Sequence, residues 1–136
     1  MGRNLRTANF IVTNCHRPFE RGQWDCNLFI TDLLDHLDGG NRSEEIRGKY
    51  HDKRTAIKFQ SKYTPAPDFI AANGFTLVEK DSTEFKDHDI ILVPCGKYWT
   101  ASLYFGGATW SVVDGQGMMM NTVEPGRHLV GEYNGK

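Results

Sequence analysis

The sequence predicts an α+β domain in which helices come first and antiparallel strands follow. Apolar residues recur with a helical period in the first half of the chain, whereas the second half holds β-branched and aromatic runs bounded by turns. A length of 136 residues suits one core, so we expect a single domain over residues 1–136. Short connections between successive strands predict an antiparallel meander with the helices packed on it.

The strongest helical pattern covers residues 26–38. An apolar stripe with a period of about 3.6 residues runs along this segment, through Cys26, Ile30, Leu33, Leu34 and Leu37. Asp25 is positioned as the N-cap, because a carboxylate there accepts the free backbone N–H groups of the first turn. Gly39 and the residues after it predict the end of the helix.

Three weaker helical segments follow. Residues 43–50 predict a short helical turn. Residues 52–63, capped by Asp52 and stopped before Pro65, predict a second helix, and residues 67–74 predict a third.

The second half of the chain predicts strands wherever β-rich runs alternate with turn residues. These runs are residues 75–79, 89–94, 99–105, 108–113 and 118–124, with a last short strand within 124–133. The sequence Asp-Gly-Gln-Gly at 114–117 is a turn signal, so the strands on its two sides are expected to form a hairpin.

The composition argues against several classes of function. Sixteen Lys and Arg residues against 17 Asp and Glu residues give a formal net charge of -1, which provides no basic field for nucleic acid. No apolar run approaches the roughly 18 residues that cross a bilayer. The N-terminal stretch also lacks the apolar core of a signal peptide. We therefore expect no nucleic-acid partner, no membrane insertion and no signal peptide.

The three cysteines are Cys15, Cys26 and Cys95, and no C-x-x-C pair occurs. An odd number without paired spacing is typical of free thiols in a reducing compartment. A mixed site of Cys15, His16 and Cys26 is a minor alternative, because its spacing matches no standard zinc pattern. We expect no disulfide, no metal and no other cofactor.

Cys26 at the start of a helix has two interpretations. A helix N-terminus favours a thiolate through its free N–H groups and its dipole, whereas the neighbouring charge of Asp25 opposes one. Free cysteine is also among the most buried residue types, and a cysteine that begins an apolar stripe usually belongs to the core. Position alone favours the core interpretation.

The surrounding sequence adds a resemblance. "RPFERGQWDCNLFITDLLDHLDG" resembles the P-F-x-W-G-x-x-D-C-x-x-F opening of a family of small phage and prophage proteins within the NlpC-type cell-wall cysteine peptidase superfamily. "IRGKYHDKRTAIKF", "HDIILVP", "WTASLYFGG" and "TWSVVDGQGMMMNTVEP" resemble later segments of it, in order, from about Arg17 to Pro125. The resemblance implies a papain-like NlpC-type domain whose N-terminal helix carries Cys26 and packs on the antiparallel meander.

The resemblance also implies a site. In the superfamily, a helix-start cysteine attacks an amide carbonyl, a strand histidine accepts the thiol proton, and a third polar residue orients the histidine. The nucleophile position falls on Cys26, the histidine position on Thr100, and the third position within residues 111–114. Threonine is not a general base at neutral pH, so the histidine is lost.

Other histidines are candidates for a substitute base. His16, ten residues before Cys26, is a weak candidate, and His128 is a weaker one. His88 precedes a strand, where we expect an exposed loop position. The sequence therefore identifies no base for Cys26.

Trp24 and Trp99 flank the Cys26 and Thr100 positions. Aromatic rings stack on sugars, so the two tryptophans are candidates for lining a substrate groove. Packing in the core is the commoner role for tryptophan and is the favoured interpretation.

Two functions follow from the resemblance. We expect a bacteriophage virion protein of the tail, made in the host cytoplasm, that binds other virion proteins as a structural or adaptor module and has lost catalysis. The alternative is an active cysteine amidase or endopeptidase that cleaves peptidoglycan peptides during infection. The missing histidine favours the first function, and the intact helix start at Cys26 keeps the second open.

Overall fold

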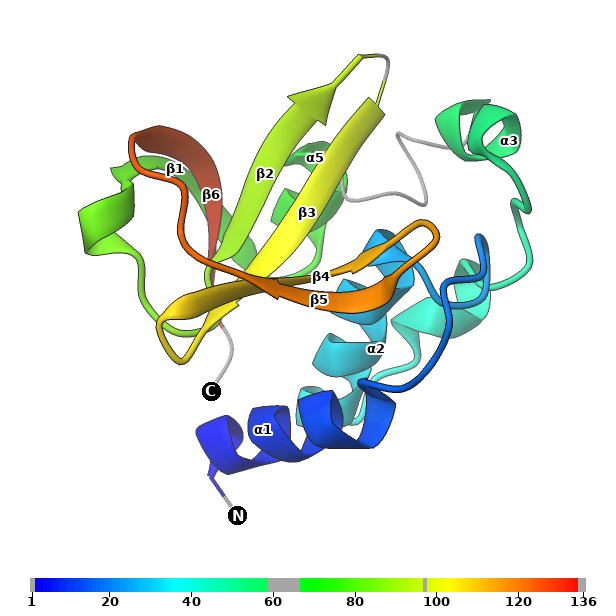
Figure 1. Ribbon diagram of the computed structural model, residues 1–136, viewed down its shortest axis with the longest axis horizontal. Helices are drawn as coiled ribbons and strands as arrows, with labels where there is room; N and C mark the ends of the chain where they lie inside the picture. The colour runs from blue at the N-terminus through cyan, green and yellow to red at the C-terminus, as the bar shows by residue number, and fades with distance from the viewer. Residues whose placement is uncertain (1, 59–66, 97, 135–136) are drawn as a thin grey trace.

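The computed structural model describes residues 2–58, 67–96 and 98–134. Its helical elements are α1 (Arg3–Asn14), α2 (Cys26–Asp38), η1 (Arg42–Glu45), α3 (Lys53–Lys58), α5 (Pro67–Ala72) and η2 (Ser82–Glu84). Its strands are β1 (Phe75–Asp81), β2 (Ile90–Cys95), β3 (Tyr98–Phe105), β4 (Ala108–Val113), β5 (Gly117–Asn121) and β6 (Arg127–Tyr133), which form one antiparallel sheet (Figure 1). The predicted α+β class, with helices first, is confirmed.

The strand order corrects the predicted meander. The order is β1-β6-β2-β3-β4-β5, so only β2 to β5 follow one another as predicted, and β6 lies between β1 and β2. A glycine, Gly131, permits this insertion, because a Cβ there would lie 2.7 Å from the Ile70 side chain and 3.3 Å from that of Phe75. The hairpin predicted at 114–117 is confirmed by the pairing of β4 with β5.

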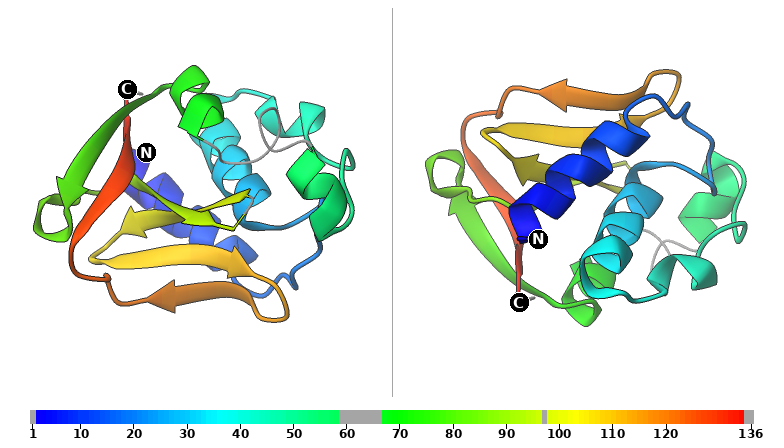
Figure 2. Two further views of the ribbon diagram at one scale, coloured as in Figure 1. Left: turned by 90° about the horizontal axis from the view of Figure 1, so that it is seen from above. Right: turned by 90° about the horizontal axis from the view of Figure 1, so that it is seen from below.

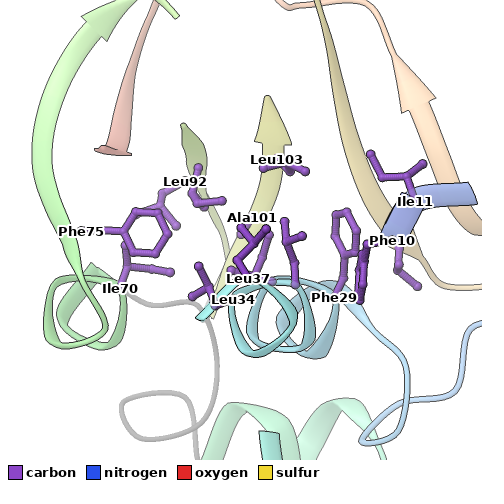
Figure 3. Close-up of a cluster of buried hydrophobic side chains, with 14 of the residues drawn as sticks. Phe10, Ile11, Phe29, Leu34, Leu37, Ile70, Phe75, Leu92, Ala101 and Leu103 are labelled. Atoms are coloured by element: carbon purple, nitrogen blue, oxygen red, sulfur yellow. The ribbon is translucent and has the colours of Figure 1, made fainter. Parts of the chain in front are cut away.

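The helix predicted over residues 26–38 is confirmed as α2. The Asp25 side chain caps its first turn, and Gly39 ends it in the left-handed conformation with φ of 75°. One side of α2 packs on the sheet (Figure 3), and the opposite side places Leu28 in a second cluster with Ile46, Tyr50 and Ala56. Because α2 is buried on two sides, it forms the centre of the domain.

The sequence did not predict α1. This helix has no side-chain cap and exposes Leu5 and Val12, so its local signals are weak. It buries Phe10 and Ile11, and Phe10 stacks with Phe29 of α2 at a ring-centroid distance of 6.2 Å. Tertiary packing, and not local preference, therefore accounts for α1.

The remaining helical predictions are confirmed in part. The only helical part of the segment 43–50 is the last three residues of η1, which begins at Arg42, and the segment 67–74 contains α5. In the segment 52–63, α3 covers Lys53–Lys58, and residues 59–63 and Pro65 lie outside the described residues.

The two faces of the sheet differ in what covers them. Helices α1 and α2 lie together on one side of it (Figure 2), and α2 contacts β3 and β4. Buried residues of alternate positions face α2, namely Ile90, Leu92, Ala101, Leu103 and Val112. The residues between them therefore point to the opposite face. Among the described residues, no helix has the length and apolar character needed to cross a membrane.

Candidate functional site

A pocket of about 290 Å³ opens between β3 and β4 at the start of α2. The two strands pair only where Leu103–Phe105 meets Ala108–Trp110, and the pocket lies beyond that paired stretch. Its lining residues are Phe19, Arg21, Cys26, Thr100, Ala101, Ser102, Ser111, Val112, Val113 and Asp114. The structure thus brings together Cys26, Thr100 and the segment 111–114, which the sequence comparison assigned to one site.

Asp25 is the most heavily hydrogen-bonded group beside the pocket. Its buried carboxylate accepts from the backbone N–H groups of Gly22 (2.9 Å), Asn27 (3.0 Å) and Leu28 (2.9 Å), and from the Tyr50 hydroxyl (2.7 Å). Burial and this carboxylate raise the pKa of Tyr50 far above its usual value, so the phenol stays protonated as a donor. Asp25 therefore takes the anionic position at the helix N-terminus that a thiolate would otherwise occupy.

The Cys26 thiol is held in its neutral form. Burial raises the pKa of Cys26 from 9.0 to about 12, and the charge of Asp25 adds to the rise. The backbone N–H of Ala101 and the charge of Arg21 act in the opposite direction and are outweighed. At neutral pH the thiolate fraction is on the order of one in 10⁵, so Cys26 is a poor nucleophile in this state.

No imidazole lines this pocket in the described part of the chain. Thr100 is half-buried at the pocket wall, where its hydroxyl donates to the Val93 carbonyl at 3.4 Å. His16 is exposed after α1 and is not among the lining residues. His128 lines a different pocket. The histidines that the sequence offered as substitutes are thus not brought to Cys26.

An ion pair spans one side of the pocket. Arg21 Nη2 lies 3.4 Å from Asp114 Oδ2, and 74% of the Asp114 side chain is exposed. The pair joins the loop before α2 to the β4–β5 turn, and both residues line the pocket. Sequence reasoning missed Arg21, because its partner is 93 residues away and no local pattern signals the contact.

The two tryptophans do not form a groove. Trp24 is only 1% exposed and packs edge-on against Phe29 with a ring-centroid distance of 5.9 Å. Trp99 is half-buried against the same core and is not a lining residue of the Cys26 pocket. The structure supports the core interpretation for Trp24, because a buried ring offers no face to a sugar. Trp99 packs against the core and lies outside the Cys26 pocket.

His88 differs from its predicted exposed position. Its side chain is 3% exposed, its backbone has φ of 77°, and its Nε2 is hydrogen-bonded to Thr7 Oγ1 at 2.7 Å. Helix α1, which supplies Thr7, covers it. Its Nδ1 is buried without a hydrogen-bond partner, and burial lowers the pKa of the imidazole. The expected exposure was wrong because the covering helix was not predicted.

In the described ranges, no group of three or more His, Cys, Asp or Glu side chains is arranged so that it could hold a metal ion.

Comparison with known proteins identifies a family. The chain belongs to the family described as domain of unknown function DUF6950, whose model matches residues 3–127. Searches of curated proteins and of solved structures found no match to the chain.

Proposed function

We propose that this member of the DUF6950 family is a bacteriophage virion protein, part of the tail, with a papain-like NlpC-type fold that no longer catalyses peptide cleavage. It serves there as a structural or adaptor module that binds other virion proteins. The observation that carries the loss of catalysis is the Cys26 pocket, in which burial keeps the thiol protonated. Its lining includes Thr100, the residue to which the sequence resemblance assigns the histidine position.

The likeness to the NlpC superfamily rests on sequence and is supported by arrangement. Segments from about Arg17 to Pro125 resemble that superfamily in order. In the structure, the helix-start cysteine packs against an antiparallel sheet, and the segments with Thr100 and 111–114 line one pocket with it. The assignment to a phage tail rests on the sequence resemblance alone.

The chemistry favours the non-catalytic role. A cysteine hydrolase needs a thiolate and a base, and general-base assistance is commonly worth ~10²–10⁴-fold in rate. Here the thiol is neutral, and Asp25 already holds the N–H groups of Asn27 and Leu28. Neither requirement of the reaction is met at neutral pH.

Mass spectrometry of purified phage particles from cells that encode the chain tests the virion role. We expect the protein in the particles in an amount comparable to tail subunits, cross-linked to at least one of them. Recovery of the protein only from the cell lysate, with no particle-bound fraction, would contradict the proposal.

A second function is favoured by one observation, the position of the half-buried Cys26 in the lining of a pocket of about 290 Å³. The protein would then be a cysteine amidase or endopeptidase acting on peptidoglycan peptides. Release of amino groups from purified peptidoglycan decides between the two functions. We expect the wild-type protein and Cys26→Ser to give the same background release, whereas release that Cys26→Ser abolishes would establish the enzyme.

A further inference from the structure

A second pocket lies on the face of the sheet opposite α2. Its volume is about 240 Å³, and its lining residues are Phe85, Ile91, Val93, Ser102, Thr109, Asn121, Thr122, Glu124 and His128. Register places the strand residues on one face, since Ile91 pairs with Ser102 and Thr109 pairs with Asn121. Ser102 also lines the Cys26 pocket, so the two pockets are neighbours.

Polar side chains in this outer pocket keep their hydrogen-bonding capacity. The side chains of Ser102, Asn121, Thr122 and Glu124 make no hydrogen bond to any other part of the chain that the structure describes. Together they offer hydroxyl donors and acceptors, an amide with both functions, and a carboxylate acceptor. These groups are therefore free to bind a ligand that itself carries donors and acceptors.

Apolar surface in the outer pocket adjoins these polar groups. Val93, near the end of β2, is 42% exposed on this face of the sheet. The Phe85 ring is held by Tyr104 and His128, with ring-centroid distances of 5.7 Å and 5.8 Å. Phe85 and Val93 thus offer apolar contacts to a ligand, and binding would lose little side-chain entropy at these residues.

The charge of the lining selects against anions. No lysine or arginine lines the outer pocket, and Glu124 contributes a negative charge. A phosphate, a nucleic acid or an acidic sugar would find no lysine or arginine among the lining residues, whose one imidazole is His128, and would be repelled by Glu124. The ligand that matches is uncharged.

The position of the outer pocket on a face of the sheet argues against an extended peptide. Strand residues reach the pocket with side chains that stand on this face. The unpaired backbone groups lie in the plane of the sheet, at the outer edge of β5 and where β3 and β4 separate beyond Leu103–Phe105 and Ala108–Trp110. Peptide strands bind through such in-plane backbone groups, and not through the side chains of a sheet face. Dispersed hydroxyl, amide and carboxylate groups beside fixed apolar surface suit a ring that carries hydroxyls on one face and C–H groups on the other.

We propose that the outer pocket binds a single uncharged sugar ring of a glycan. Asn121 and Glu124 hydrogen-bond the sugar hydroxyls, and Phe85 and Val93 contact its C–H face. The volume is below the ~300–1,000 Å³ of sites for drug-sized ligands, in agreement with one ring. Binding is non-covalent, and it depends neither on the state of Cys26 nor on particle assembly.

A ¹H–¹⁵N NMR titration of the full chain tests this site. The probes are the methyl glycosides of glucose, galactose, mannose and N-acetylglucosamine, with glucose 6-phosphate as the anionic comparison. We expect at least one neutral glycoside to bind with a Kd on the order of 1 mM, with the largest amide shifts at Asn121 and Thr122. Glucose 6-phosphate should bind at least about tenfold more weakly.

Variants assign the contacts. Asn121→Ala should weaken binding by about tenfold, because it removes a hydrogen-bond partner of the sugar. Glu124→Gln should weaken binding by a similar factor, because it replaces a charged acceptor with a weaker neutral one. Glu84→Gln is the matched control, since Glu84 is exposed on η2 and does not line the pocket. It should leave the affinity unchanged.

Three outcomes would overturn the sugar site. One is the lack of saturable shifts with every neutral glycoside up to about 20 mM. Another is a set of shifts centred on Ser111 and the Cys26 pocket. The third is a short uncharged peptide that binds the outer pocket more tightly than any glycoside. Particle analysis and peptidoglycan digestion report on the proposed function separately, so failure of one proposal leaves the other standing.

Discussion

Two buried polar groups, Asp25 just before α2 and His88 just before β2, differ in how many hydrogen bonds the fold provides for them. Asp25 accepts four hydrogen bonds, from three backbone N–H groups and the Tyr50 hydroxyl. His88 has one bond, to Thr7, and its Nδ1 has no partner. A fully satisfied group fixes the structure around it, whereas a half-satisfied one leaves a point where the structure can loosen.

The largest effect is expected in the reactivity of Cys26, which is next to the fully hydrogen-bonded Asp25. Because the pKa of Cys26 is raised from 9.0 to about 12, its thiolate fraction at neutral pH is about a thousandfold below that of an ordinary thiol. Iodoacetamide at pH 7 should therefore label Cys15 and Cys95, both exposed, far faster than Cys26. Peptide mass spectrometry over time gives the three rates. Equal rates, or faster labelling of Cys26, would show that burial and the charge of Asp25 do not exclude the thiolate.

Removal of the Asp25 carboxylate should have the next largest effect, a loss of unfolding free energy. Asp25→Ala leaves the buried Tyr50 hydroxyl and three backbone N–H groups without an acceptor, so we expect a loss of about 3–5 kcal/mol in unfolding free energy. Urea denaturation measures the loss. Asp52→Ala, which removes the exposed acceptor for the Thr55 N–H at the start of α3, is the matched control and should have a much smaller effect. Similar losses for the two variants would contradict the special role of Asp25.

A smaller loss of unfolding free energy is expected when His88 loses its hydrogen bond. Thr7→Val keeps the shape of the side chain but removes the one hydrogen bond of His88, which should cost about 1–2 kcal/mol. Urea denaturation again gives the value, and hydrogen exchange should show faster opening of α1 and unchanged protection of α2. Loosening of α2 to the same extent would mean that the two regions are not independent.

The smallest effect should be a change of unfolding free energy with pH. Burial and then Arg3 lower the pKa of His88, while Asp87 and Asp89 act against this shift. The unfolded chain therefore binds this proton more readily, so stability holds above about pH 6.5 and falls as the pH drops below it. The loss stays limited, because opening of α1 lets the charged ring reach water. Urea midpoints at pH 8, 7, 6 and 5 measure the trend.

The variant His88→Asn supplies the control for that trend. Asparagine tolerates the left-handed backbone at this position and does not titrate in this range. Its stability should be flat between about pH 8 and 5, since carboxyl groups with lowered pKa values, such as Asp38 and Glu132, respond only at lower pH. A slope equal to that of the wild type would assign the pH dependence to another group.

The same contrast explains what the sequence could predict. Helix α2, its Asp25 cap and the β4–β5 turn have local signals, and all three were predicted. The burial of His88 depends on α1, and the position of β6 depends on Gly131, so both arise from contacts between distant segments. Local patterns carry no information about such contacts.

The candidate site divides in the same way. The placement of Cys26 at a helix start was predictable from spacing, and sequence resemblance indicated Thr100 and residues 111–114. The sequence also favoured a core cysteine and a charge at Asp25 that opposes a thiolate. The contact with β3 near Ala101 was not predictable, because it joins distant segments. The outer pocket was missed entirely, since its residues come from five strands and two loops with no shared motif.

The position of β6 has a consequence for synthesis of the chain. Strand β6 pairs with β1 on one side and β2 on the other, and in the described residues β1 has no other strand partner. While the ribosome makes residues 82–126, β1 therefore has no strand to pair with, and α5 has only β1 to pack against. The sheet closes only when Arg127–Tyr133 emerges, so a nascent chain stalled before that point should remain sensitive to protease across residues 67–81 even though α2 and β2 to β5 are already present.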